Sequence, residues 1–193
     1  MAATGLNKKV KRSLNNEFIL IRDARLEELD KISLLLKEAY QQYESILPTD
    51  AWNSYMEDIM NVRSRQDKSQ LIVAEVNKQL VGTVTLYLNA HRSEQEGWPR
   101  GWAGIRLLAV HPSYRSRGIG RALMEECLRR CRREGIATVG LHTTEMMDVA
   151  RRMYERMGFI RVPKFDFHPR PDAVVMAYRL DLKTPIGQSE TAD

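Results

Sequence analysis

The sequence is short of cysteine and has no long apolar run. Only two of its 193 residues are cysteines, Cys127 and Cys131. They lie one turn apart on a predicted helix, on the same face as Ile119 and Leu123, so we interpret them as core thiols rather than as a metal or redox pair. No run of about 18 apolar residues occurs, so no membrane helix is expected. The N-terminus also lacks the apolar core of a signal peptide, and we expect a cytoplasmic protein without a membrane partner.

The composition is that of an ordinary globular protein. Apolar residues make up 43% of the chain and charged residues 28%, and the length suffices for one domain with a sizeable core. The net charge of +5 favours an anionic partner but does not by itself indicate nucleic acid. We expect a flexible basic arm over residues 1–16, a single domain over 17–182 and a polar tail over 183–193.

Apolar patterning predicts a mixed α/β (α+β) fold in which helices flank one sheet. Strands are expected at 18–22, 70–76, 80–89, 102–110, 137–143, 159–162 and 173–182, with a hairpin turn at 77–79. Helices are expected at about 23–43, about 50–60, from the turn at 115–120 to Gly135, and from about 144 to Gly158. Residues 91–101 and 164–172 are expected to form loops.

One stretch suggests a site for a phosphate-bearing ligand. An apolar run at 107–110 leads into the basic turn HPSYRSRGIG, which leads into an amphipathic helix. The unpaired N–H groups and the dipole of a helix start attract anions. Gly118 and Gly120 have no Cβ, so a large anion can approach the backbone, and Arg115, Arg117 and Arg121 add positive charge. Taken alone, the turn is better explained as a strand-to-helix connection with surface arginines.

Two segments together resemble the GNAT superfamily of acetyl-CoA-dependent N-acetyltransferases. The first is R-x-x-G-x-G, here Arg115 to Gly120, preceded by the sequence LAVHP. The second is A-x-x-x-Y-x-x-x-G-F, here Ala150 to Phe159, some 30 residues further on. The order of the predicted elements also resembles that fold from Phe18 to Leu182. The resemblance implies a central, mostly antiparallel sheet of about seven strands, splayed between the fourth and fifth strands.

The resemblance implies acetyl-CoA as the acetyl donor and no metal. The pyrophosphate would bind the basic turn, and pantetheine would pair with the strand before it. The residues implied to bind the cofactor are Leu108, Val110, Arg115, Ser116, Arg117, Gly118, Ile119, Gly120, Arg121 and Tyr154. The physics of the turn agrees, because CoA brings about four negative charges at neutral pH to a helix start with three arginines.

The resemblance also implies a mechanism. Tyr154 matches the family tyrosine that faces the CoA sulfur and would act as the general acid toward the departing thiolate. A neutral amine would attack the thioester carbonyl directly, and the oxyanion would be stabilised by the backbone N–H of Val110. The amine must first lose a proton, yet residues 102–108 hold no carboxylate where many family members carry Glu. Glu94, Glu96 or a chain of waters could accept that proton.

The acceptor pocket in this family is built from the first two helices and the late loops. In this sequence those segments supply Tyr40, Tyr43, Glu44, Trp52, Tyr55, Asp166, His168 and Arg170. The aromatic residues suit an amine with an apolar body, and Glu44 and Asp166 could hold a cation. The acceptor itself stays open: a small amine, an amino acid, an antibiotic, or a peptide or protein amine.

Two other functions compete with the transferase. A non-catalytic acyl-CoA sensor would keep the turn without the chemistry, and the missing strand carboxylate favours it while Tyr154 argues against it. A nucleic-acid-binding module would use the basic arm and the arginines at 129–133, but a solvated helix face explains these more simply, so we expect no nucleic-acid partner. The sequence leaves a homodimer open.

Overall fold

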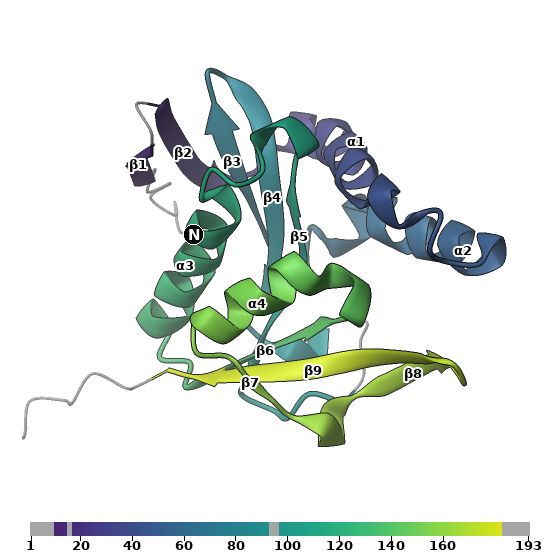
Figure 1. Ribbon diagram of the computed structural model, residues 1–193. Helices are drawn as coiled ribbons and strands as arrows, with labels where there is room; N and C mark the ends of the chain where they lie inside the picture. The colour runs from purple at the N-terminus through teal and green to yellow at the C-terminus, as the bar shows by residue number, and fades with distance from the viewer. Residues whose placement is uncertain (1–9, 15–16, 93–96, 183–193) are drawn as a thin grey trace, which may run out of the picture. The chain divides into compact units, whose positions relative to one another are not determined.

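The computed structural model describes residues 10–14, 17–92 and 97–182. The chain divides into two compact units. The first unit combines Met1–Tyr87 with Ile105–Cys127, and the second combines Leu88–Gly104 with Leu128–Asp193. Each unit is described by itself (Figure 1).

The first unit is built on an antiparallel sheet. Strands β1 (Val10–Leu14), β2 (Glu17–Asp23), β3 (Gln70–Val76) and β4 (Gln79–Tyr87) pair in that order, and β5 (Ala103–Val110), most of which lies in this unit, adjoins β4. A tight turn joins β3 to β4 through Asn77 and Lys78, whose φ angles of 49° and 65° are left-handed. That conformation matches the twist of a two-residue hairpin, so the predicted hairpin turn is confirmed.

Helices cover this sheet because their apolar residues recur at helical spacing. They are η1 (Leu26–Glu28), α1 (Leu29–Tyr40), η2 (Gln41–Tyr43), α2 (Thr49–Met60), η3 (Arg63–Arg65), η5 (Pro112–Tyr114) and the start of α3 (Ile119–Arg133). Helix α1 buries Ile32, Leu35 and Leu36. In Figure 1, α1 and α2 lie on one side of the strands and the start of α3 lies on the other.

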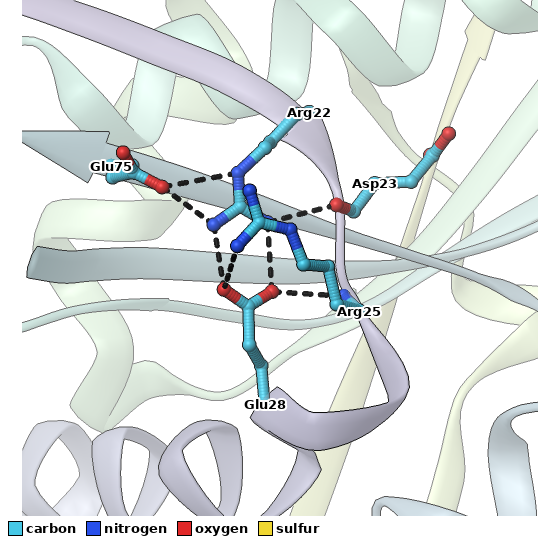
Figure 2. A network of polar contacts seen from close by, with 5 residues as sticks. All are labelled: Arg22, Asp23, Arg25, Glu28 and Glu75. Carbon is cyan, nitrogen blue, oxygen red and sulfur yellow. Dashed lines mark hydrogen bonds and ion pairs between the residues drawn. The ribbon is translucent and has the colours of Figure 1, made fainter. Parts of the chain in front are cut away.

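A buried ion network ties the start of this unit together (Figure 2). Arg22 on β2 is only 2% exposed. Its Nη1 and Nη2 donate to the two carboxylate oxygens of Glu28, both at 2.7 Å, and its Nε and Nη2 donate to Glu75 Oε2 at 3.1 and 2.6 Å. The same Glu28 carboxylate accepts the backbone N–H of Arg25. One arginine therefore links β2, β3 and the turn into α1, with its charge balanced by two carboxylates.

The second unit is organised around its last strand. Its elements are η4 (Ala90–Arg92), β6 (Thr138–Thr143), η6 (Glu145–Met147), α4 (Asp148–Arg156), β7 (Ile160–Arg161), η7 (Pro163–Phe165), β8 (Phe167–Arg170) and β9 (Ala173–Asp181). Strand β9 pairs antiparallel with β6, β7 and β8.

An aromatic core fills the second unit. Trp98 is 3% exposed and stacks on Trp102, with ring centroids 5.5 Å apart. Phe165 and His142 pack on the same indole at 5.5 and 4.5 Å. A Cβ added at Gly140 would meet the Trp98 ring at 2.8 Å, so this glycine makes room for the indole. The loop at 91–101 thus contributes a core residue.

The predicted fold class is confirmed: helices flank strands that pair mostly antiparallel. Both cysteines are fully buried, as expected of core thiols, and burial raises the pKa of Cys131 to about 12. The single domain over 17–182 and the splay between the fourth and fifth predicted strands stay predictions.

Two predictions about unstructured segments are wrong in part. Val10–Leu14, expected in a flexible arm, forms strand β1, because its backbone pairs with β2 from Val10↔Ile21 to Leu14↔Glu17. Phe167–Arg170, expected in a loop, forms β8, which pairs with β9 at Phe167↔Val175 and Arg170↔Ala173 across an irregular register. The remaining arm residues 1–9 and 15–16, and the tail 183–193, lie outside the described residues.

Candidate functional site

Strand β5 has a left-handed residue in its middle. Leu107 has φ of 54°, an uncommon conformation for a leucine and one that kinks a strand. The next residue, Leu108, accepts a hydrogen bond on its carbonyl oxygen from the Tyr40 hydroxyl at 3.3 Å. Both Leu108 and Val110 are half-buried. This kink was not predicted, because the sequence LLAV is also typical of a regular strand.

The turn after β5 presents backbone N–H groups at the start of α3. His111 accepts the N–H of Ser113 on Nδ1 at 3.2 Å and so caps η5. Ser116 and Gly118 then take left-handed φ angles of 61° and 74°, and α3 begins at Ile119. Alternation of left- and right-handed residues before a helix makes a concave set of N–H donors, which is a typical anion site. The turn therefore offers backbone N–H groups of the kind that bind anions, and its role as a cofactor site stays a prediction.

A close contact fixes where α3 starts. A Cβ added to Gly82 on β4 would lie 3.0 Å from both Ile119 and Leu123 and 3.2 Å from the Ala109 carbonyl oxygen. Ile119 itself is 2% exposed, so its side chain packs in the core while its backbone lies in the turn. Gly120, the next residue, is half-buried.

The three arginines of the turn are exposed, and each has a contact within the first unit. Arg115 donates to the Ala39 carbonyl at 2.8 Å and to Gln42 Oε1 at 2.9 Å. Arg117 lies 4.9 Å from the centre of the Tyr114 ring, and Arg121 pairs with Glu125 at 2.8 Å. Such surface contacts are weak and exchange readily for a stronger anion.

The acceptor residues predicted from the first two helices lie close together in part. The rings of Tyr43 and Tyr55 pack edge-on against Tyr40, at 6.1 and 5.8 Å. Tyr40 and Trp52 are each 8% exposed, and Glu44 is exposed. Burial raises the pKa of Tyr40 and of Tyr55 well above the usual value, so both are neutral donors. We call Tyr40, Tyr43 and Tyr55 the tyrosine cluster.

A half-buried ion pair, not predicted from the sequence, lies beside this cluster. Arg106 on β5 donates from Nη2 to Asp58 Oδ2 on α2 at 3.1 Å. Its side chain is 11% exposed. The sequence signal for this pair was an isolated arginine in an otherwise apolar strand.

Strand β5 contains no carboxylate that could deprotonate the amine, and the alternative bases Glu94 and Glu96 lie outside the described residues.

The second unit holds the remaining predicted site residues. Tyr154 on α4 is 7% exposed, and its ring centre lies 6.0 Å from that of Phe159. Asp166 accepts hydrogen bonds from the Arg161 guanidinium and from the Ala177 N–H, so it has an internal cationic partner. His168 is exposed on β8. The roles of these three residues stay predictions.

Neither a metal site nor a membrane-spanning helix is found in the described part of the chain. Within 10–14, 17–92 and 97–182, no three His, Cys, Asp or Glu side chains gather as a metal site would require. Over the same ranges, every helix is too short or too polar to span a membrane.

Known structures share this fold. The PaiA N-acetyltransferase of Thermoplasma acidophilum in complex with coenzyme A is 18% identical, with a TM-score of 0.65 over 85% of this chain and 99% of that chain. The putative acetyltransferase yncA of Salmonella typhimurium, with acetyl-CoA, is 16% identical, with a TM-score of 0.61 over 88% and 96%. The ribosomal-protein-S18-alanine N-acetyltransferase of Escherichia coli is 16% identical, with a TM-score of 0.58 over 91% and 99%.

The sequence itself matches the acetyltransferase (GNAT) family over residues 30–159. That range holds both motifs, the turn before α3 and the tyrosine of α4. The chain therefore belongs to the GNAT family of acetyl-CoA-dependent N-acetyltransferases.

Proposed function

We propose that the turn from Arg115 to Arg121 binds the pyrophosphate of acetyl-CoA and that the chain transfers the acetyl group to a primary amine. The observation that carries this proposal is the pair of left-handed residues, Ser116 and Gly118, directly before α3. Their N–H groups, the helix start and three exposed arginines suit a pyrophosphate. Strand β5, kinked at Leu107, would pair its backbone at Leu108 and Val110 with the pantetheine arm.

The bound cofactor supplies an activated thioester, and the chain's residues supply positioning and proton transfer. The N–H of Val110 would stabilise the oxyanion of the tetrahedral intermediate. Tyr154 would donate a proton to the departing sulfur. Because β5 offers no carboxylate, the proton of the attacking ammonium would leave through water or through Glu94 or Glu96.

The test combines binding with turnover. The purified protein is titrated calorimetrically with acetyl-CoA, and thiol release is followed with a panel of primary amines. We expect binding together with release that depends on an amine. Binding without release on any amine would indicate a sensor instead, and absence of binding would exclude the turn as a cofactor site.

The compartment and the assembly are also proposals. We propose the cytoplasm, supported by two buried cysteines that form no disulfide, and a homodimer as the assembly to test by light scattering. The acceptor pocket predicted from the sequence includes Glu44, Trp52, Asp166 and His168, and alanine substitution with measurement of the acceptor KM tests each of them.

A further inference from the structure

The Arg106 guanidinium has an unused donor. Its Nη2 is paired with Asp58 at 3.1 Å, but its Nη1 is buried and has no hydrogen-bond partner among the residues that the structure describes. Guanidinium N–H groups that are removed from water without an acceptor are costly and therefore rare. The position next to the Leu107 kink puts this donor on the strand proposed to bind pantetheine.

The surroundings of Arg106 are aromatic and include a second guanidinium group. Burial raises the pKa of Tyr40 and of Tyr55, and the positive charge of Arg106 acts on both phenols in the opposite direction. Arg65 is also buried nearby, donating to the Asp58 and Ile59 carbonyls at 2.7 and 2.6 Å. Arg65 therefore contacts the backbone of Asp58, whereas the Asp58 carboxylate is bound by Nη2 of Arg106. The buried Nη1 of Arg106 can donate to a second anionic partner.

We propose that the acceptor amine also carries a carboxylate, which accepts a hydrogen bond from Nη1 of Arg106. This inference rests on the proposed transferase function and names its substrate class, an amino carboxylate with an apolar body that packs on the tyrosine cluster. A carboxylate suits the place better than a phosphate, because the single vacant nitrogen lies beside the negative charge of Asp58. Within the tyrosine cluster Tyr43 and Tyr55 are half-buried, and the apolar body of the acceptor would pack on these two rings.

The test compares acceptors that differ only in the charged group. Thiol release is measured with phenylalanine against phenylalaninamide and with β-alanine against β-alaninamide, and kcat/KM is expressed per neutral amine. We expect the wild type to prefer the carboxylate of at least one pair by about ten- to a hundredfold, the range of a charge-assisted hydrogen bond. In the double variant Arg106→Gln/Asp58→Asn, which keeps a neutral hydrogen-bonding pair, the preference should fall to about one.

The matched control is Arg63→Gln. Arg63 also pairs with an aspartate of the first unit, Asp30 at 2.9 Å, but both side chains are exposed, so the preference should stay at the wild-type ratio. As a readout without turnover, N-acetylphenylalanine and N-acetylphenylalaninamide are titrated into the protein with CoA. The same carboxylate preference should appear there and disappear in the double variant.

The possible failures are separable. If amines are acetylated but carboxylate and carboxamide react alike in wild type and variant, the role of Arg106 is wrong while the transferase function stands. If acetyl-CoA binds and no amine of either kind is acetylated, the proposed function fails and the inference fails with it.

Discussion

Arg115 Nη2 donates a hydrogen bond to the carbonyl oxygen of Ala39 at 2.8 Å. This contact joins the turn before α3 to the last turn of α1, one residue before Tyr40. The guanidinium also donates to Gln42, so the arginine proposed to bind phosphate already makes hydrogen bonds to α1 and η2. These bonds link the proposed cofactor turn to the tyrosine cluster within the first unit.

Arg115→Ala should lower both stability and cofactor affinity. Removing two hydrogen bonds of an exposed arginine should reduce the free energy of unfolding by about 0.5–1 kcal/mol, measured by urea titration, and weaken acetyl-CoA binding. Lys31→Ala removes an exposed cation of α1; it is the control and should leave the unfolding midpoint unchanged. An unchanged midpoint for Arg115→Ala with lost affinity would show that the contact with Ala39 contributes nothing.

Gly120 should tolerate a methyl group better than a charge. Gly120→Ala favours the helix by about 1 kcal/mol and should retain measurable acetyl-CoA binding by calorimetry. Gly120→Glu places a carboxylate among the N–H groups proposed for the pyrophosphate and should abolish binding, while the circular dichroism spectrum stays that of the wild type. Full affinity in Gly120→Glu would move the cofactor site elsewhere.

Tyr154→Phe should slow turnover and leave binding nearly unchanged. Loss of a general acid costs about a hundredfold in kcat, whereas the buried ring is retained. Tyr178→Phe is the control: it removes another buried phenol of the second unit, one that donates to Glu155 at 3.0 Å, and kcat should not change. Equal kcat for Tyr154→Phe and the wild type would exclude the general-acid role.

The ion network around Arg22 should make the free energy of unfolding depend on pH in the acidic range. The hydrogen bond from Arg22 lowers the pKa of Glu28 below its usual value of 4.5. A lowered folded pKa means that the unfolded chain binds the proton first, so the contribution is complete above about pH 4.5 and is lost as pH falls through the folded pKa.

Glu28→Gln tests this contribution. It should reduce the free energy of unfolding by about 2–3 kcal/mol at pH 7, and the difference from wild type should shrink toward pH 3 in urea titrations. Asp30→Asn removes an exposed carboxylate paired with Arg63 and should change stability by less than about 0.5 kcal/mol. A difference between Glu28→Gln and wild type that does not vary with pH would exclude the linkage.

The sequence predicts most elements of this fold because their apolar residues follow simple periods. The sequence pattern correctly placed the buried faces of α1 and α3. It also placed the hairpin turn at Asn77 and Lys78. Strand β8 was not predicted because it contains Pro169, and proline usually indicates a break in regular structure. A strand that pairs along one edge can nevertheless contain a proline. Strand β1 was not predicted because its sequence, VKRSL, shows no strict alternation of apolar and polar residues, although it pairs with β2.

A sequence motif located the candidate cofactor turn, and its role stays a prediction. In the turn at 115–120 the left-handed residues are Ser116 and Gly118, while Gly120 lies inside α3. Arg106 and Asp58 are separated by 48 positions, and no local pattern relates an arginine in a strand to an aspartate on a distant helix. The kink at Leu107 was equally hidden, since leucine has no preference for φ above zero.

Gly82 allows the first turn of α3 to pack closely on β4. A Cβ at this position would lie only 3.0 Å from the Ile119 and Leu123 side chains. The position of this helix start, and of the N–H groups proposed to bind pyrophosphate, thus depends on a residue of β4 far upstream in the sequence. A methyl group at position 82 would push the start of α3 away from β4. We would expect it to change cofactor affinity although it replaces none of the residues proposed to bind phosphate.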